Sequence, residues 1–483
     1  MDTGEATAAV GPLDTAALAA KVEESFEREI VPALERYVAL RCLSPAFDAD
    51  WEAHGALDEA AAMLRSWAER RALAGVSAEV VRLSGRTPVV LVEVPATDPD
   101  RAGTTTLIYG HLDKQPPLST WRAGLDPFVA RREGDQLYGR GTVDDGYAAF
   151  AALAALEALA ATGTRHGRCV LLIEASEESG SPDLNAYLDH LAERIGRPRL
   201  VLCLDAGGPS FDRLWVTTSL RGLLGVSLEV EVLEAGVHSG LASGAVPDSF
   251  RIARQLLSRV EDERTGEILL PELHAEIPAH RRDEAAVVAA ELGGALDARF
   301  PTVAGLVLAG TDATDRLLRT TWDPTLTVIG ATGLPAPRDA GNLLRPGTAL
   351  SLSFRLPPTV EAGAAAAAVV AALGTQPPSG ARVRATATES GQGWDAPEEA
   401  PWLARATREA SLAYFGAPPG HLGIGGSIPF MAGLGHRFPG TQFLATGALG
   451  PSSNEHGPDE SLHLPTAKAV AATVAHVVAS VPV

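Results

Sequence analysis

The chain has 483 residues, 46% of them hydrophobic, which predicts a globular protein of two domains rather than one. Its formal net charge of −20 argues against nucleic acids and anionic membrane surfaces as partners, because phosphate groups would be repelled. Three widely spaced cysteines, an N-terminus without the basic flank of a secretory signal, and no apolar run long enough to span a bilayer together favour the cytoplasm.

The first part of the chain alternates predicted helices with predicted strands. Apolar residues recur with helical periodicity over about 16–40, and 56–73 resembles a second helix. The segments that follow are predicted as strands at Val89–Val94, Thr105–Tyr109, Cys169–Ile173 and Leu200–Leu204, and as helices at Ala148–Ala161 and Leu184–Ile195. This alternation predicts an α/β fold, with a mainly parallel sheet that carries helices on both faces.

The pattern changes at about residue 220. Residues Leu224–Val232 alternate apolar and polar side chains, as a strand with one solvated face does. The later elements are predicted as a helix at 247–260, strands at 325–330, 348–356 and 382–388, and a helix at 361–373. They predict a small α+β domain with an antiparallel sheet, in which 261–320 is an elaboration. The predicted organisation is a first domain over 1–218 and 391–483, with 219–390 inserted.

Histidine and carboxylate side chains stand just beyond several of these strands, where open α/β sheets place their ligands. A pair of divalent metal ions needs oxygen and imidazole ligands, a bridging carboxylate and a free base. The residues that offer this set are His111, Asp113, Asp144, Glu177, Glu178, Asp205 and His456. Taken singly, each has a simpler interpretation, such as a turn histidine, a solvated pair of glutamates, or a helix N-cap in the case of Asp145. The combination favours a two-metal site.

Eight short motifs strengthen this interpretation: GHLDKQP, YGRGTVDDG, EASEESGS, LRG, VHSG, FRLPP, GGSIP and SNEHGPDE. Through them, and over about residues 25–483, the chain resembles the dinuclear metallopeptidase family of carnosinase, bacterial dipeptidases, acetylornithine deacetylase and succinyl-diaminopimelate desuccinylase. The resemblance implies a zinc-exopeptidase-like catalytic domain, with an inserted domain that serves as a lid and in dimerisation.

The resemblance also implies two divalent metal ions per subunit. Zinc is the first expectation, and manganese and cobalt are the alternatives, because all three suit nitrogen and oxygen ligands. His111 and Asp205 would bind one ion. Glu178 and His456 would bind the other, and Asp144 would bridge the two.

Further roles follow from the same resemblance. Asp113 would orient His111, and Glu177 would be the general base. His238 would reach the site of the partner subunit in a homodimer and stabilise the oxyanion there. The substrate's carboxylate would be held by residues of the inserted domain and of the glycine-rich loop, namely Arg355, Asn342, Gly426 and Ser427.

Two departures from the family pattern affect the expected site. After the bridging aspartate and the Asp or Asn that follows it, many relatives have lysine and glycine, where this chain has Gly146-Tyr147. Many dipeptidases also have Arg-Glu in place of Gly423-Ile424. The sequence predicts an enzyme that hydrolyses an amide bond in a dipeptide or a similar small substrate with a free carboxylate. The alternatives are an N-acyl amino acid deacylase, a non-hydrolytic metal-binding scaffold and an amide-forming biosynthetic enzyme.

Overall fold

The computed structural model describes residues 13–426 and 428–483. The expectations about the N-terminus and Ser427 therefore fall outside the described residues. The chain divides into two compact units. Unit 1 contains the chain up to Thr217 together with Ala396–Leu422 and Gly433–Val483, and unit 2 contains Thr218–Asp395 and Gly423–Ala432. The glycine-rich loop thus groups with unit 2, although it lies far along the chain from the rest of that unit.

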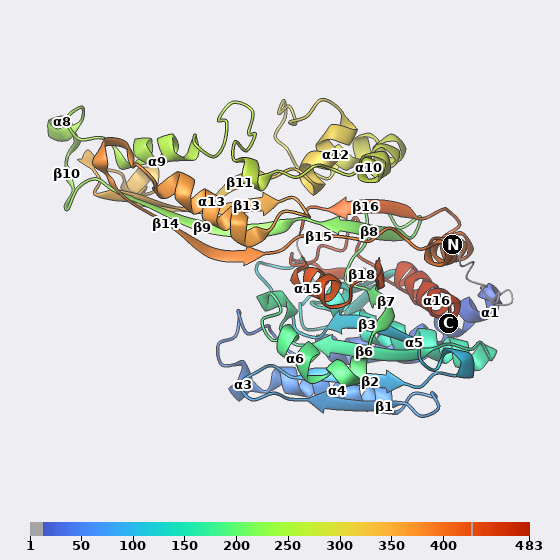
Figure 1. Ribbon diagram of the computed structural model, residues 1–483. Coiled ribbons are helices and arrows are strands. Elements are labelled where there is room, and N and C mark those ends of the chain that lie inside the picture. Colours follow the sequence, from blue (N-terminus) through green and yellow to red (C-terminus); the bar gives the residue numbers. More distant parts are fainter. Residues whose placement is uncertain (1–12, 427) are drawn as a thin grey trace. The chain divides into compact units, whose positions relative to one another are not determined.

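Unit 1 is built on a sheet whose centre is parallel. Its strands are β1 (Ser77–Val81), β2 (Val89–Val94), β3 (Thr105–His111), β6 (Arg168–Glu174), β7 (Pro198–Cys203) and β17 (Gln442–Ala445). They lie in the order β1-β2-β6-β3-β7-β17, which Figure 1 shows rising from β1 at the lower edge as far as β7. Strands β6, β3, β7 and β17 run parallel to one another, whereas β1 pairs with β2 and β2 pairs with β6 in antiparallel fashion. The predicted α/β fold with a mainly parallel sheet is confirmed.

The remaining strands of unit 1 form a small antiparallel sheet or lead out of the unit. The small sheet contains β4 (Arg131–Glu133), β5 (Gln136–Tyr138) and β18 (Ser461–His463). Two further strands, which pair with each other, cross the boundary between the units: β8 (Trp215–Leu220) and β16 (Gly420–Ile424).

Helices cover both faces of the central sheet in unit 1, since every residue of β3 is buried. They are α1 (Thr15–Ser25), α2 (Val31–Val38), α3 (Trp51–His54), α4 (Ala56–Glu69), α5 (Tyr147–Thr162), α6 (Leu184–His190), α7 (Ala192–Ile195), α14 (Pro401–Tyr414) and α16 (Leu464–Ser480). Helix α15 (Pro429–Arg437) begins in unit 2 and ends in unit 1. The alanine-rich α5 is buried nearly all round because its small side chains pack against α1 and α16.

Unit 2 contains a four-stranded antiparallel sheet in the order β11-β13-β9-β14. Its elements are β9 (Gly222–Glu231), β10 (Val237–His238), α8 (Ser239–Ala242), α9 (Ser249–Leu257), α10 (Ala279–Leu292), α11 (Gly294–Ala298), α12 (Ala313–Thr321), β11 (Thr325–Thr332), β12 (Leu343–Leu344), β13 (Gly347–Leu356), α13 (Ala362–Gly374), β14 (Arg382–Gly391) and β15 (Trp394–Asp395). One face of the sheet packs against α9 and α13 through alternate buried residues of β9 and β13. The region 261–320, for which the sequence predicted no elements, contains α10 and α11 and most of α12.

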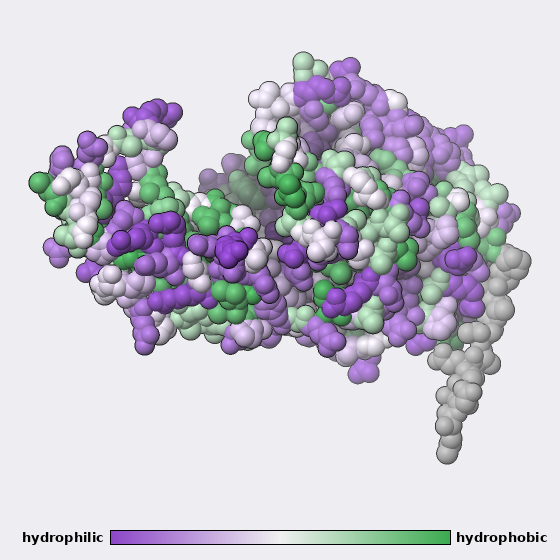
Figure 2. All heavy atoms as spheres, turned by 90° about the horizontal axis from the view of Figure 1, so that it is seen from above, coloured by the Kyte–Doolittle hydropathy of each residue, from purple (hydrophilic) through white to green (hydrophobic). Residues whose placement is uncertain are grey.

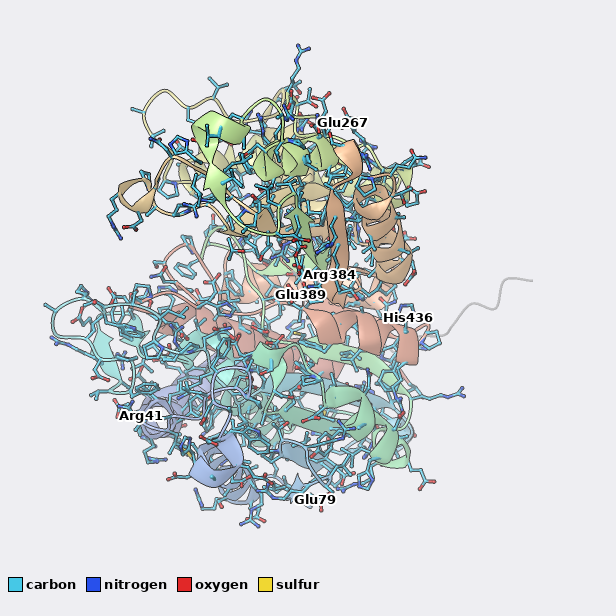
Figure 3. The ribbon with its side chains drawn as sticks, turned by 90° about the vertical axis from the view of Figure 1, so that its left-hand side faces the viewer. Arg41, Glu79, Glu267, Arg384, Glu389 and His436 are labelled. Carbon is cyan, nitrogen blue, oxygen red and sulfur yellow. The ribbon has the colours of Figure 1, made fainter. Side chains whose placement is uncertain are left out.

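The other face of this sheet is polar. Arg384 on β14 forms an ion pair with Glu229 on the neighbouring β9, with 2.7 Å between nitrogen and oxygen. Figure 3 labels Arg384 together with Glu389, which lies on the same strand. The alternation of buried and exposed positions is what the sequence predicted for a strand with one solvated face.

Short helical turns complete the chain. A π-helical turn at Phe26–Ile30 joins α1 to α2, and another spans Thr142–Gly146. The 3-10 turns lie at Pro99–Arg101, Glu177–Ser179, Pro271–Leu273, Pro337–Asp339 and Pro378–Gly380. Within the described ranges, we find no helix with both the length and the apolar composition that a membrane span requires.

Candidate metal centre

His111 and Asp205 meet because they end or follow adjacent parallel strands. His111 is the last residue of β3, and Asp205 comes two residues after β7. The carboxyl ends of β3 and β7 lie side by side, so His111 Nε2 lies 3.9 Å from Asp205 Oδ2. Both residues are buried. Both residues thus lie at the carboxyl ends of parallel strands, where open α/β sheets place their ligands.

Asp144 lies between two imidazole groups. It belongs to the turn at Thr142–Gly146, and its peptide bond to Asp145 is cis. Asp144 Oδ1 lies 3.0 Å from His111 Nε2, and Oδ2 lies 3.0 Å from His456 Nε2. The two oxygens of one carboxylate thus face two different histidines, which is the arrangement that a bridging ligand requires.

Glu178 and His456 complete a second group. Glu178 lies in the 3-10 turn after β6, and its Oε2 is 3.1 Å from His456 Nε2. Gln115 donates a hydrogen bond from Nε2 to the same Glu178 oxygen at 2.7 Å. Sequence reasoning missed Gln115, although it stands only two residues after Asp113 in the first motif.

The charges of this cluster favour a cation. Burial by itself raises the pKa of Asp144, but hydrogen bonds from His111 and His456 outweigh it and hold the pKa well below the ordinary value. Hydrogen bonds to Asp144 and Glu178 raise the pKa of His456 to about 11. Without a cation, the carboxylates therefore hold a proton on the imidazole. A bound metal would replace that proton, so metal affinity is expected to fall at low pH.

The donor atoms fit two metal ions. One group contains His111, Asp144 and Asp205, and the other contains Asp144, Glu178 and His456; within each, the ligand atoms all lie within 4.8 Å of one another. Each group offers one imidazole nitrogen and two carboxylate oxygens, a set that suits zinc, manganese and cobalt. We call the two groups the first triad and the second triad. They share Asp144.

Asp113 holds the turn that carries the predicted general base. Its carboxylate accepts hydrogen bonds from the backbone N–H groups of Glu177 at 3.1 Å and Glu178 at 3.0 Å. His111 Nδ1 lies 3.1 Å from the Asp113 carbonyl oxygen and 3.5 Å from its carboxylate. Asp113 therefore contacts both His111 and the glutamate pair.

Glu177 lies beside the ligands without belonging to either triad. Burial, together with the negative charges of Asp205 and Glu178, raises the pKa of Glu177 well above its ordinary value. A carboxylate in this position is suited to hold and release a proton.

The structure explains why no lysine follows the acidic pair. A Cβ atom on Gly146 would lie 2.2 Å from the Gly141 carbonyl oxygen and 2.3 Å from the ring of Tyr37, so no side chain fits there. Asp145 is buried. The N-cap role for Asp145 is wrong, because Gly146 occupies the cap position of α5.

The substrate-binding residues predicted in unit 2 fall into two groups. His238 is the second residue of the short strand β10, and its Nδ1 accepts a hydrogen bond from Gly240 N at 3.1 Å. Asn342 is next to it, since Ser239 N donates to the Asn342 carbonyl oxygen at 2.9 Å. The sequence grouped Asn342 with Arg355, but the structure places it beside His238.

Arg355 lies at the opposite end of the unit 2 sheet. It pairs with Leu223 near the start of β9, whereas His238 adjoins the end at which Gly347 pairs with Glu231. Eight residues of β13 separate Gly347 from Arg355, which is about 26 Å at the rise of an extended strand. His238 and Arg355 of one unit 2 are therefore too far apart to contact the same dipeptide, which spans about 7 Å.

Arg221, which sequence reasoning noted only as part of the motif LRG, shapes the loop that contains Gly426. It is buried, and its guanidinium donates to the carbonyl oxygens of Gly425 at 3.2 Å and Asp323 at 3.1 Å. Burial, and then the nearby charge of Arg355, lowers the pKa of Arg221 to about 10. Burial also lowers the pKa of Arg355, and Glu389, labelled in Figure 3, opposes that shift.

The second departure from the family pattern also has a steric cause. A Cβ atom on Gly423 would lie 2.5 Å from Ser219 Oγ and 3.2 Å from Thr321 Cβ. A large side chain such as arginine at this position of β16 would require its neighbours to move.

Comparison with known families now identifies the class of the protein. Residues 107–480 match the family described as Peptidase family M20/M25/M40. Because this match covers most of the chain, the protein belongs to that family and is a hydrolase of the metallopeptidase class. The predicted resemblance is confirmed.

Individual relatives include both dipeptidases and a deacylase. The chain is 27% identical over 367 residues to the Cysteinylglycine-S-conjugate dipeptidase of Corynebacterium striatum, covering 74% of this chain and 77% of that protein. It is 32% identical over 172 residues to a Succinyl-diaminopimelate desuccinylase of Methylobacterium sp. (strain 4-46), covering 34% and 42% respectively. The crystal structure of human carnosine dipeptidase 1 aligns with a TM-score of 0.74 at 20% identity, over 97% of this chain and 99% of that one, and shares the fold.

Proposed function

We propose that this protein is a dipeptidase that hydrolyses the amide bond of a dipeptide or a similar small substrate with a free carboxylate. The observation that carries the proposal is the sharing of Asp144 by two triads, with Glu177 beside them. The Corynebacterium striatum relative, matched over most of its length, is named a dipeptidase and supports the same activity.

The residues of unit 1 divide the work between metal binding and proton transfer. Two bound ions would supply a water of lowered pKa and would polarise the amide carbonyl. Glu177 takes a proton from the attacking water and passes it to the leaving nitrogen. Asp113 keeps Glu177 in place through the hydrogen bond that it accepts from the Glu177 backbone N–H at 3.1 Å.

The residues of unit 2 are proposed to recognise the carboxylate of the substrate. The guanidinium of Arg355 is a fixed positive charge suited to bidentate binding of a carboxylate. Gly426 and Ser427 would add donors from the glycine-rich loop, which Arg221 holds through Gly425.

We further propose a homodimer in which His238 and Asn342 act at the partner's site. Because His238 and Arg355 of one subunit lie about 26 Å or more apart, contact with a single dipeptide requires that they come from different subunits. The sheet has an exposed edge at β11, which invites strand pairing. The end with α8 and β10 exposes Leu241 at 82% and Leu343 at 43%, and Figure 2 shows apolar surface there, on the left.

Mixed dimers test this arrangement. His238→Ala and Glu177→Gln are co-expressed with two different tags, and the mixed dimer is purified. One of its two sites then has both an intact base and an intact oxyanion donor. Random assortment makes half of the dimers mixed, so activity should recover to about a quarter of the unmutated level before purification and to about a half in the purified mixed dimer. No recovery in purified mixed dimers, or a strictly monomeric active enzyme, contradicts the proposal.

The metals and the compartment are also proposals. Zinc is the first candidate because one imidazole and two carboxylates per triad match its usual ligands. The cytoplasm is proposed because the three cysteines, all buried, are free thiols.

A substrate library tests the activity. Metal-free protein is loaded separately with Zn²⁺ and Mn²⁺ and incubated with dipeptides and N-acyl amino acids, and products are identified by mass spectrometry. Release of free amino acids from dipeptides is the expected result, with Glu177→Gln as the inactive control. Absence of dipeptide hydrolysis with either metal, from protein that binds two ions, contradicts the proposal.

An N-acyl amino acid deacylase is the second candidate. The identity of 32% over 172 residues to a desuccinylase favours it, and both substrate classes present an amide near a carboxylate. The same library separates the two candidates, because a deacylase would release the acyl acid from N-acyl amino acids and leave dipeptides intact.

A further inference from the structure

One buried ion pair joins the two segments that carry Asp144 and His456. Arg140 Nη1 donates to Glu460 Oε2 at 2.7 Å, and the two side chains are 1% and 0% exposed. Arg140 lies four residues before Asp144, and Glu460 lies four residues after His456. The pair therefore spans two ligands of the second triad that are far apart along the chain.

The Glu460 carboxylate holds the turn that presents Asp144. Its Oε2 accepts a hydrogen bond from Gly141 N at 3.0 Å, and its Oε1 accepts from Val143 N at 3.2 Å and from Asp144 N at 3.4 Å. The Glu460 carbonyl oxygen also accepts from Gly139 N at 3.0 Å. Four backbone N–H groups of one short turn thus depend on a single residue.

Arg140 holds the loop that presents His456. Its Nη2 donates to the carbonyl oxygen of Gly457, the residue next to His456, at 2.6 Å. His456 has a φ of 58°, a left-handed conformation that a non-glycine residue keeps only when its surroundings impose it. Its side chain is 52% exposed, so packing alone does not fix it.

The first triad depends less on this pair. Its His111 belongs to β3, and its Asp205 forms an isolated bridge with Gly447 at the end of the parallel sheet, so ladder hydrogen bonds hold both. Only the shared Asp144 connects the first triad to Glu460. In the second triad, two of the three ligands, Asp144 and His456, depend on the ion pair. In the first triad, only Asp144 does.

We propose that Arg140 and Glu460 are positioning residues that set the metal affinity of the second triad more strongly than that of the first. The inference rests on the two-metal site of the proposed function, but it requires no particular substrate. Side chains that orient metal ligands change metal affinity by about 10–100-fold when they are replaced. We expect a loss of that size at the second triad and a smaller one at the first.

Metal titration of single-site variants tests the proposal. Asp205→Ala removes one ligand of the first triad and leaves the second complete, and Glu178→Ala removes one ligand of the second triad and leaves the first complete. Glu460→Gln is added to each, and Zn²⁺ affinity is measured by competition with a chromogenic chelator. Glu460→Gln should weaken the remaining site about 10–100-fold in the Asp205→Ala protein and clearly less in the Glu178→Ala protein.

Two further variants keep the test decisive. Arg140→Lys retains the charge but replaces a forked donor by one ammonium, so it should also weaken the second triad. Glu93→Gln removes a carboxylate paired with Arg168 at 2.6 Å in the same unit, away from the ligands, and should leave both affinities unchanged. Circular dichroism identifies any variant that fails to fold.

Equal losses at the two triads, no loss in folded Glu460→Gln and Arg140→Lys proteins, or a loss as large in Glu93→Gln would each overturn the inference. The outcome is separate from that of the proposed function. Protein that binds two ions and shows the unequal loss, yet hydrolyses no dipeptide, would contradict the dipeptidase proposal and leave this one standing.

Discussion

Lys114→Met should destabilise unit 1 although it preserves the length of the side chain. Lys114 is fully buried, and its Nζ donates to the carbonyl oxygens of Tyr37 at 2.9 Å, Val38 at 3.3 Å and Leu40 at 2.9 Å. These carbonyls lie around the C-terminus of α2, where a helix leaves its last carbonyl groups without partners in the helix. The ammonium group therefore acts as the cap of α2.

The magnitude follows from these contacts. The Tyr37 carbonyl oxygen also accepts from Leu40 N at 3.0 Å, so Lys114→Met leaves the carbonyls of Val38 and Leu40 without this donor. Each buried carbonyl left without a donor costs about 1–3 kcal/mol, so the two cost about 2–6 kcal/mol. Lys114→Met also removes a buried charge, and this offsets part of that loss of stability. The charge is costly to bury, because burial lowers the pKa of Lys114 and so opposes its charged form. We expect a net loss of about 3 kcal/mol, which corresponds to a fall in Tm of about 5–10 °C for a domain of this size.

Calorimetry and lysine labelling measure the effect. The chain has only three lysines, Lys21, Lys114 and Lys468, so each can be followed by mass spectrometry after acylation. Lys21→Met is the matched control, since Lys21 is exposed and pairs with the exposed Glu24 at 2.7 Å; its loss should cost less than about 1 kcal/mol. A Tm equal to that of the parent in Lys114→Met, or acylation of Lys114 in the native protein as fast as Lys21, would refute the reasoning.

Three other predictions concern the metal centre and the surface. Glu177→Gln should keep two metal ions by elemental analysis and lose about 10²–10⁴-fold in turnover, because it deletes only the base; near-normal turnover would remove that role. Asp144→Ala should lose both ions, whereas Asp205→Ala should chiefly lose one, and unchanged stoichiometry in Asp144→Ala would exclude a bridging ligand. Hydrogen bonds from Arg132 and a neighbouring lysine lower the pKa of Glu27 to about 2 in the fold, so ionised Glu27 stabilises above about pH 4.5. The difference in free energy of unfolding between the parent and Glu27→Gln, about 1 kcal/mol at most for so exposed a group, should shrink from pH 7 to pH 3, and the difference in Tm should shrink with it; a constant difference would contradict it.

Much of the candidate metal centre could be predicted from the sequence because binding residues in an α/β sheet follow the ends of strands. The apolar runs before His111 and Asp205 are long enough to be recognised as buried strands. Parallel strands place their carboxyl ends together whatever the sequence between them, so residues far apart along the chain converge. The half-buried strands of unit 2 could also be predicted from the sequence, since alternation of apolar and polar residues depends only on neighbouring residues.

Sequence patterns alone did not show which residues hold the ligands in place. Arg140 and Glu460 are 320 positions apart, and nothing in the composition of either segment signals that they pair. Gly146 appeared as a departure from a family pattern, and only the tertiary structure shows the ring of Tyr37 in the space that a side chain would need.

In unit 2 as well, the sequence predicted the residues, and only the tertiary structure shows how they are arranged. The motifs predicted His238, Asn342 and Arg355 as residues that contact the substrate. Only the strand register shows that the first two lie at one end of the sheet and Arg355 at the other. The sequence by itself determined the chemical groups of this protein and the elements that carry them, because both depend on local pattern. Their pairing and spacing were decided by the tertiary structure, because they depend on contacts between segments distant in the chain.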